Sequence, residues 1–449
     1  MAGEVDEVKK GNPGALAPIG VFLVLYLGLG IGLEYVAGVE MGFYQIPIVV
    51  VFLVALAVAF LQNRRLSFDN KMDVVARGVG DKTLMMMVLI FLVAGIFVGT
   101  VGRSSAESVA YLMLSVVPPQ LSVVVLFVVS CFVSISMGTS VGTITLITPI
   151  AVTVAAASGF SVPLCIASVM GGAMFGDNLS FISDTTIAAC QGQGCDMSDK
   201  FKENLKIATP AALVALAIIL ALSFAGGLGE PVQHDYDLVQ VIPYILVLVG
   251  GILGLNVFAV LLAGIATGVV VMLASGASTP IDLLSGMGTG VSGMFETAMV
   301  AILVSALCAL VREHGGFDAV LYAIYSVFKG RRAGQLGMGI LVLLMDVATA
   351  NNTVAIVMAN PIAAEMAQTY GVSKRKTASI LDTFSCVSQG ILPYGAQMLV
   401  ALSAAATMGV AVSAFEIIPL MFYPMLLLVS SLAFIFLVPE RKRKVGSQA

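Results

Sequence analysis

Charged residues are scarce in this chain. Only 11% of its 449 residues are Asp, Glu, Lys or Arg, whereas 59% are apolar; an ordinary soluble domain has about 25% and roughly 45–50%. Mean hydropathy is +1.03, and no long polar block interrupts the apolar sequence. A water-soluble globule, a disordered chain and a separate soluble catalytic domain are therefore excluded. The sequence predicts an all-α polytopic membrane protein.

Groups that hold metals, nucleotides or nucleic acids are also missing. The chain has two His and six Cys, and Cys190 and Cys195 are not followed by a second Cys-x-x-Cys, so free thiols are expected. The P-loop pattern Gly-x-x-x-x-Gly-Lys-[Ser/Thr] is absent, because residues 78–83 only imitate it with Asp81 between the glycine and the lysine. A net charge of −4 does not indicate a nucleic-acid partner. We expect no cofactor and no enzymatic activity.

Several apolar runs are long enough to cross a membrane. Two longer stretches, residues 121–190 and 334–406, are apolar but punctuated by Gly, Pro, Ser, Thr, Asn and Asp, unlike straight spanning helices. Residues 105–117 and 317–328 are apolar but too short to span, which predicts connectors at the membrane interface. The eight runs of spanning length cover residues 17–38, 45–62, 83–102, 205–225, 238–254, 257–274, 294–311 and 415–438.

The two punctuated stretches resemble each other at a shift of about 205 to 212 residues. The sharpest match pairs Asp177 with Asp382 and Asp184 with Gln389, in the pattern Asp-x-x-Ser-x-x-Ser-[Asp/Gln]. This duplication predicts an N-terminal and a C-terminal repeat, each with a re-entrant hairpin and a broken helix. The N-terminal repeat is residues 1–226 (hairpin 121–158, broken helix 164–190), and the C-terminal repeat is residues 227–449 (hairpin 334–370, broken helix 377–406).

The basic residues predict the orientation of the repeats, because Lys and Arg collect in short cytoplasmic loops. In the first repeat, residues 64–77 and 200–206 are basic and the turn at 159–163 carries no charge. In the second repeat, residues 374–376 are basic where the first has that uncharged turn. The repeats are therefore predicted to be inverted across the bilayer, with about five spans each and both termini in the cytoplasm.

Acidic residues inside the apolar stretches indicate an ion or proton site, because a carboxylate at the bilayer centre costs about 2.5–3.5 kcal/mol on insertion scales. Glu296 lies near the start of its run, where it is expected to face water. Asp177, Ser180 and Asp184 are the predicted sodium ligands, since they share a helix face or converge where the backbone unwinds. The predicted cation and proton site comprises Asp177, Ser180, Ser183, Asp184, Asp346, Asp382 and Ser385.

Small and amide-bearing residues at the hairpin tips predict unwound turns. Backbone carbonyls in such turns bind a cation, and the N-terminus of the next half-helix attracts an anionic group. Any single hydroxyl there equally fits a structural role, bonded back to a carbonyl. The predicted tip and substrate residues are Thr139, Ser140, Thr143, Asn178, Asn351, Asn352, Thr353, Ser388 and Gln389.

Residues 176–186, with the sequence GDNLSFISDTT, resemble the signature of the NhaC-type sodium/proton antiporter family within the ion-transporter superfamily. The resemblance covers most of the chain. It implies paired re-entrant hairpins, a moving substrate-binding unit, a dimerising scaffold and hence a homodimer, in a prokaryotic plasma (inner) membrane. Phe181 stands where the family usually has proline, which implies a different bend in the broken helix.

Three functions fit these features. The first is sodium/proton antiport by alternating access, because sodium and protons compete for the same buried carboxylates. The second is a sodium- or proton-coupled carrier or exchanger of a small organic anion or amino acid. No intramembrane Arg or Lys is evident for a second carboxylate, as Arg103 and Arg312 lie at span ends, but helix N-termini and Asn351 and Asn352 can bind one. The third, a non-transporting membrane scaffold, leaves the buried acids unexplained.

Overall fold

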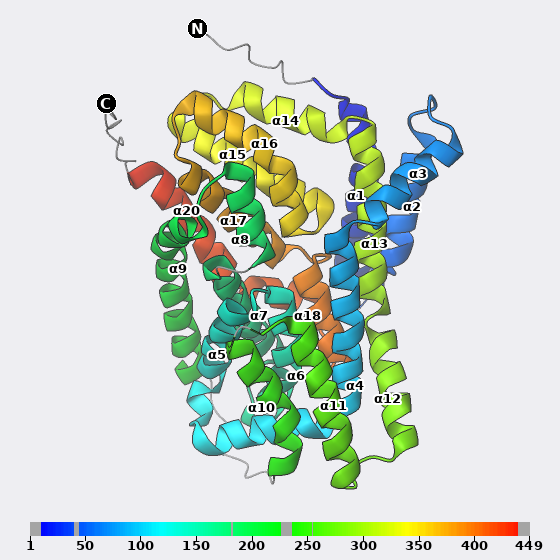
Figure 1. Cartoon of the computed structure of the whole chain (residues 1–449), viewed down its shortest axis with the longest axis vertical. Coiled ribbons are helices and arrows are strands. Elements are labelled where there is room, and N and C mark those ends of the chain that lie inside the picture. Colours follow the sequence, from blue (N-terminus) through cyan, green and yellow to red (C-terminus); the bar gives the residue numbers. More distant parts are fainter. Residues whose placement is uncertain (1–9, 40–44, 181–182, 226–235, 254, 439–449) are drawn as a thin grey trace.

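The regular elements of this computed structural model are helices throughout the described residues, which exclude 1–9, 40–44, 181–182, 226–235, 254 and 439–449 (Figure 1). Eight helices in the described part are long and apolar enough to cross a membrane, or ten if each of two bent pairs is one span. The helices are α1 (Ala17–Ile31), α2 (Ile48–Leu61), α3 (Phe68–Val79), α4 (Lys82–Val116), α5 (Ser122–Met137), α6 (Ser140–Ser158), α7 (Val162–Leu179), α8 (Asp184–Gln193), α9 (Met197–Ala225), α10 (Leu238–Ile252), α11 (Val257–Ala274), α12 (Pro280–Gly293), α13 (Phe295–Glu313), α14 (Gly316–Val327), α15 (Arg331–Thr349), α16 (Asn352–Tyr370), α17 (Lys374–Ile391), α18 (Ala396–Thr407), α19 (Ala414–Ile417) and α20 (Phe422–Leu437).

The prediction of an all-α polytopic membrane protein is confirmed. Each of the eight apolar runs lies mostly within one helix: α1, α2, α4, α9, α10, α11, α13 or α20. One boundary was wrong, because α9 begins at Met197 and the apolar run at residue 205. The first two turns of this helix contain Lys200 and Asn204, so the apolar run starts only after them. Both polar side chains have hydrogen-bond partners inside the protein.

Two helical hairpins occupy the punctuated stretches. α5 and α6 are joined at Gly138 and Thr139, and α15 and α16 are joined at Ala350 and Asn351. Gly138 and Ala350 both take the left-handed conformation that a two-residue turn between helices requires. The side chains of Thr139 and Asn351 then cap α6 and α16 by accepting backbone N–H groups, so each second helix starts at the tip.

Each hairpin is followed by a broken helix. α7 ends at Leu179 and α8 begins at Asp184, and the caps Ser180 and Ser183 at this first break are both extended. The expectation about Phe181 lies outside the described residues. The second break, residues 392–395, separates α17 from α18, and Leu392 is extended because it precedes Pro393.

The glycines before the first break do not interrupt α7. They let α7 approach α5: a Cβ on Gly172 would lie 2.2 Å from the Phe127 carbonyl oxygen, and one on Gly176 2.5 Å from that of Cys131. In the second copy, Asp382 lies within α17, ten residues before the break at Leu392, and not at the interruption.

The two sets of elements correspond at a single shift of 212 residues. This shift pairs the helix prolines Pro149 and Pro361. It also pairs the caps Thr139 and Asn351, and the starts of the two breaks at residues 180 and 392. At this shift Asp177 corresponds to Gln389, so the sequence match of Asp177 with Asp382 is wrong by seven residues. Seven residues are close to two helical turns, and a slip of that size keeps the same helix face and hence a similar polar pattern.

The two predicted connectors lie at opposite ends of the molecule. α4 bends at Gly102, whose φ of 64° only glycine adopts easily, and the part after the bend runs across the bottom of Figure 1. Residues Ser104–Val116 and the following Pro119–Ile135 enclose a bend of 115°. α14 runs across the top of the same view.

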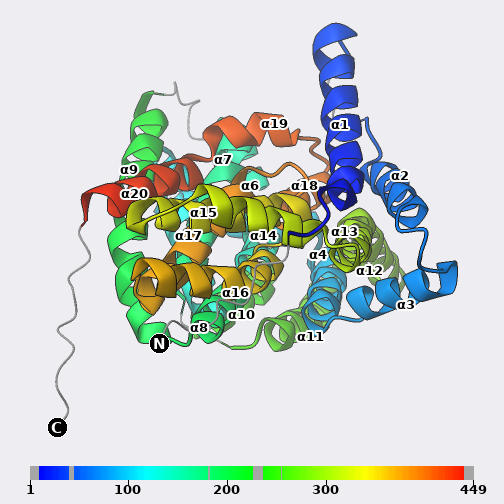
Figure 2. The same ribbon diagram turned by 90° about the horizontal axis from the view of Figure 1, so that it is seen from above.

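Seen from above, the helices form two groups (Figure 2). α1 to α3, α12 and α13 lie to one side with the long part of α4, and the hairpins and broken helices lie to the other with α9 and α20. Glycines hold α4 against α12: a Cβ on Gly99 would lie 2.1 Å from the Gly286 carbonyl oxygen, and one on Gly95 2.4 Å from that of Gly290. This pairing has no room for a side chain.

Substitution of Gly99 by Ala is therefore expected to push α4 away from α12. Overpacking of this kind costs about 1–3 kcal/mol, so the thermal unfolding midpoint of the purified protein in detergent should fall. Gly28→Ala is the matched control, because no atom lies within 4 Å of a Cβ at Gly28 in α1. Equal midpoints for the two variants would contradict the close packing of α4 on α12.

Candidate functional site

A cavity of about 800 Å³ lies where the two hairpin tips meet the two helix breaks. Its wall is completed by the start of α4, from Lys82 to Ile90, and by Asn256 and Phe258 at the start of α11. Lys82, Asp184 and Gln191 are exposed, so solvent reaches the cavity. The predicted site residues that line it are Thr139, Ser140, Asp177, Asp184, Asn351, Asn352, Thr353 and Gln389.

A chain of hydrogen bonds joins the two tips along the wall of this cavity. Ser140 Oγ donates to Asp177 Oδ2 at 3.3 Å, and Gln397 Nε2 donates to Ser140 Oγ at 3.2 Å. Gln389 Nε2 donates both to Gln397 Oε1 and, at 3.3 Å, to the carbonyl oxygen of Ala350. One end of the chain is the carboxylate of Asp177 in the first half, and the other is the second hairpin tip, so hydrogen bonds connect Asp177 with both halves.

Asp177 and Asp184 border the same cavity but differ in surroundings. Asp177 belongs to the last turn of α7 and is 7% exposed, whereas Asp184 is the first residue of α8 and is exposed. Ser180 and Ser183 shape the break between them. Ser180 Oγ donates to the Ile135 carbonyl oxygen at 2.8 Å, and Ser183 caps α8 and donates to the Asp177 carbonyl oxygen at 3.2 Å.

A second polar cluster lies behind the first break, around Lys200. Its Nζ is 2.8 Å from Asp382 Oδ2, and it donates to Thr186 Oγ1 at 2.6 Å and to the Asn178 carbonyl oxygen at 3.1 Å. Asn204 Nδ2 donates to the same carboxylate oxygen at 2.6 Å and to the same carbonyl at 2.8 Å. The side chains of Lys200 and Asp382 are each 1% exposed.

The sequence interpretation of Lys200 was therefore wrong. It placed this lysine in a basic cytoplasmic loop and found no lysine inside the membrane domain, because the apolar run starts only at residue 205. A usable signal was present: Lys200, Asn204 and the apolar Ile207 and Ala208 are three or four residues apart, which predicts one buried helix face. Thr186 and Gln397 were also missed as site residues. Thr186 is the last residue of the 176–186 motif, and Gln397 is a polar residue in a largely apolar helix, α18.

The remaining predicted residues lie outside the cavity wall. Asp346 is fully buried in α15 and accepts a hydrogen bond of 2.5 Å from Ser388 Oγ. Ser385 Oγ donates to the Asp382 carbonyl oxygen, and Thr143 Oγ1 to that of Thr139, which are bonds within a helix and its cap. Asn178 faces away from the cavity, with Nδ2 donating to Tyr423 Oη at 2.8 Å and to Cys386 Sγ.

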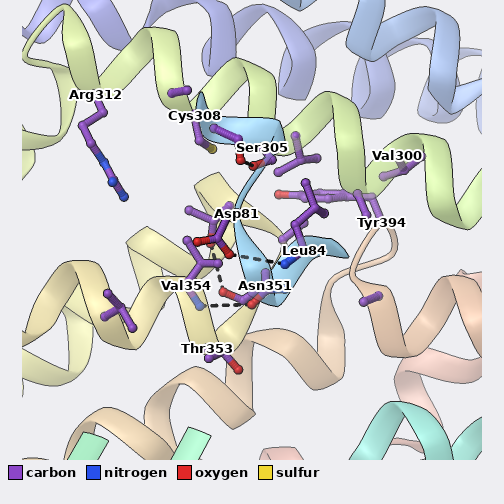
Figure 3. A pocket seen from close by; sticks show the side chains of 18 of the residues that line it. Asp81, Leu84, Val300, Ser305, Cys308, Arg312, Asn351, Thr353, Val354 and Tyr394 are labelled. Atoms are coloured by element: carbon purple, nitrogen blue, oxygen red, sulfur yellow. Dashed lines mark hydrogen bonds between the residues drawn. The ribbon is translucent and has the colours of Figure 1, made fainter. Parts of the chain in front are cut away.

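A smaller cavity of about 240 Å³ lies on the other side of the second hairpin tip (Figure 3). Asn351 and Thr353 line both cavities, so this tip is the wall between them. Asp81 from the α3–α4 connection lies beside Asn351, and Tyr394 from the second break also lines this smaller space (Figure 3). The tip is therefore flanked by open volume on two sides, where it borders the α3, α4 and α13 helices.

The match to known families decides the class of protein. The model of the family described as "Na+/H+ antiporter family" matches residues 18–226 and 238–438. The chain belongs to this family. Its members are secondary transporters, which agrees with the multi-span fold and with the resemblance of residues 176–186 to the NhaC-type signature.

Two bacterial proteins are similar in sequence to this chain. The malate-2H(+)/Na(+)-lactate antiporter of Bacillus subtilis is 24% identical over 362 residues, which is 72% of this chain and 74% of that protein. An uncharacterized protein of Haemophilus influenzae is 34% identical over 113 residues, 24% of this chain and 22% of that one. Among solved structures, the YdaH transporter of Alcanivorax borkumensis matches 92% of this chain and 97% of its own, with 12% identity and a TM-score of 0.46. The MtrF pump of Neisseria gonorrhoeae matches 93% and 94%, with 11% identity and a TM-score of 0.43.

Cysteine labelling tests the position of the cavity. All cysteines of the chain except Cys195 are buried, so the Cys195→Ser variant should show little labelling of its native cysteines. In it, Asp184→Cys and Asn352→Cys should react with a charged methanethiosulfonate roughly tenfold faster or more than Thr143→Cys, which is buried and outside the cavity wall. Labelling of Asp184→Cys as slow as that of Thr143→Cys would show that water does not reach the first break.

Proposed function

We propose that this chain exchanges sodium for protons and that the two ions compete for the carboxylate of Asp177. The observation that carries the proposal is the position of Asp177, at the end of α7 and in the wall of the cavity where both tips and both breaks meet. A carboxylate there is reached by ions but is surrounded by protein, so its charge has to be balanced by a bound cation or a proton.

Sodium fits this position because it prefers hard oxygen ligands. We place the ion between Asp177 and Asp184, with the hydroxyl oxygen of Ser140, 3.3 Å from Asp177 Oδ2, as a further ligand. Ser180, the hydroxyl ligand predicted from the sequence, is less suited, since its Oγ donates to Ile135 and the residue does not line the cavity. A proton on Asp177 removes the main ligand, which makes the two ions exclusive.

Exchange also requires that the site faces one side of the membrane at a time. We propose that the two halves are inverted, as the basic segments predict. Glu203 lies in one basic segment and Arg375 in the other, and Glu203 Oε1 is 3.1 Å from Arg375 Nε, so the two segments meet on one face of the molecule. The connectors at opposite ends, the part of α4 after Gly102 and α14, support the same arrangement.

The wider setting belongs to the same proposal. The chain is placed in a prokaryotic plasma membrane with both termini in the cytoplasm, and it assembles as a homodimer. It uses ion gradients and has no enzymatic activity or bound cofactor. The group of helices that contains both hairpins and both broken helices carries the ions. It moves against a scaffold formed by α1 to α4 and α11 to α13.

A second candidate is the exchange of a small organic anion, coupled to these ions. The cavity volume of about 800 Å³ favours it, because it far exceeds the size of a sodium ion and falls in the range of small-molecule sites. Asn351, Asn352 and the N-terminus of α16 offer hydrogen-bond donors for one carboxylate. The relative from Bacillus subtilis is named for malate and lactate. Lys200 does not supply the basic group for a second carboxylate, because its charge is paired with Asp382 and it does not line the cavity.

Asp177→Asn tests the proposed antiport directly. The amide keeps the size of the side chain but cannot take up a proton or carry the charge that balances sodium, so sodium-driven proton movement in proteoliposomes should be lost. Asp69→Asn is the control, because Asp69 is an exposed acid of α3 outside the cavity. Sodium uptake that still changes with pH in Asp177→Asn would refute the role of this carboxylate.

The organic-anion candidate is tested with the unmodified protein. Proteoliposomes under an imposed sodium or proton gradient are offered labelled lactate, malate and a panel of amino acids. If sodium and protons exchange at full rate without any solute, and no solute is accumulated, simple antiport stands. Exchange that starts only when a carboxylic acid is added would instead favour the second candidate.

A further inference from the structure

Lys200 stands in a set of oxygen atoms that matches a cation site. The carboxylate of Asp382, the hydroxyl of Thr186 and the backbone carbonyl of Asn178 lie 2.8, 2.6 and 3.1 Å from Nζ. Carboxylate, hydroxyl and carbonyl oxygens are also the ligands that alkali cations take in proteins. The ammonium group thus has the surroundings of a bound cation, but it is tethered to α9.

The helix break explains why one of these ligands is available. The carbonyl groups of the last helical turn lack the amide partner four residues further on. α7 ends at Leu179, so the Asn178 carbonyl is released from the helix, and Lys200 and Asn204 supply its hydrogen bonds. The same break exposes Asp177 to the cavity on its other side.

The carboxylate of Asp382 depends on this lysine. It is 1% exposed, and its Oδ1 has no hydrogen-bond partner within the described structure. Its Oδ2 is held by Lys200 and by the neutral amide of Asn204. The other charged group nearby is Glu203, which pairs with Arg375 and Lys206 and not with Asp382. Without Lys200, Asp382 is a buried charge with no counter-ion, which proteins do not tolerate without a bound cation or a proton.

We propose that the ammonium group of Lys200 fills a second cation site, built by Asp382, Thr186 and the Asn178 carbonyl, so that the protein loads a single sodium ion. Removal of the lysine side-chain charge should open this site to a free sodium ion. The count of one ion per cycle rests on the proposed sodium site at Asp177, whereas the opening of the second site does not.

The test is equilibrium binding of ²²Na to the purified full-length protein at alkaline pH. We expect one sodium ion for the unmodified protein and two for Lys200→Met, whose unbranched side chain retains most of the volume. Lys202→Met is the matched control: Lys202 lies on the same helix, its side chain is 66% exposed, and it pairs with Asp199 on the surface. It should bind one ion.

The double variant Lys200→Met with Asp382→Asn separates the new site from other effects. It buries no unpaired charge, so it should fold and bind one ion again. In sodium flux assays the Hill coefficient should rise from about one toward two in Lys200→Met and return to about one in the double variant.

Each remaining outcome is decisive. The proposal is overturned if Lys200→Met binds no more sodium than the unmodified protein, or if the double variant keeps the additional ion. If Lys200→Met aggregates equally in sodium and in choline chloride while the double variant folds, sodium does not replace the ammonium group and the proposal fails. If the unmodified protein binds no sodium but Lys200→Met binds one, the second site stands and the proposed sodium site at Asp177 fails.

Discussion

The end of helix α7 in the protein interior is the constraint on which the site depends. A break there releases backbone groups on its buried side, and each buried group left unpaired costs several kcal/mol. Side chains meet the demand: Ser183 donates to the Asp177 carbonyl, Thr186 to that of Ser180, and Lys200 and Asn204 to that of Asn178. Most polar side chains of this region therefore form hydrogen bonds to the backbone at the break. The proposed ion site uses the carboxylate of Asp177, which the break leaves facing the cavity.

The break has two sides with opposite properties. Successive helical residues point about 100° apart, so Asp177 borders the cavity while Asn178 points into the protein, toward Tyr423 and Cys386. On the cavity side a carboxylate is open to exchange with the surroundings. On the inner side the charge of Asp382 is matched by Lys200, at a side-chain exposure of 1% for both. Asp177, on the cavity side, can exchange the ion that it binds, whereas the charge of Asp382, on the inner side, stays paired with Lys200.

The arrangement of the helices suits a carrier in which one part moves against another. Backbone-to-backbone packing of α4 on α12 at Gly95 and Gly99 makes a contact with no side chains to rearrange. The second hairpin tip, by contrast, has a cavity on each side, and Asn351 and Thr353 belong to both. Hydrogen bonds from Asp177 through Ser140 to the second half give the ion site a direct link to this tip.

The sequence by itself determined the all-α membrane fold, the two punctuated stretches and the acids within them, because hydropathy and the cost of a buried charge act along the chain. It did not determine which helices are long enough to span, since several of those in the structure lie in the punctuated stretches. Tip turns were also predictable, since Gly138 and the capping side chains of Thr139 and Asn351 are local signals. The register of the repeat was not predictable, because a slip of about two helical turns keeps the same polar face. The sequence match therefore paired Asp177 with Asp382 instead of Gln389. The buried position of Lys200 was not predictable either. Only tertiary structure brings Asp382, 182 positions away in the sequence, against it, and that ion pair is what allows a lysine that reads as a loop residue to be buried.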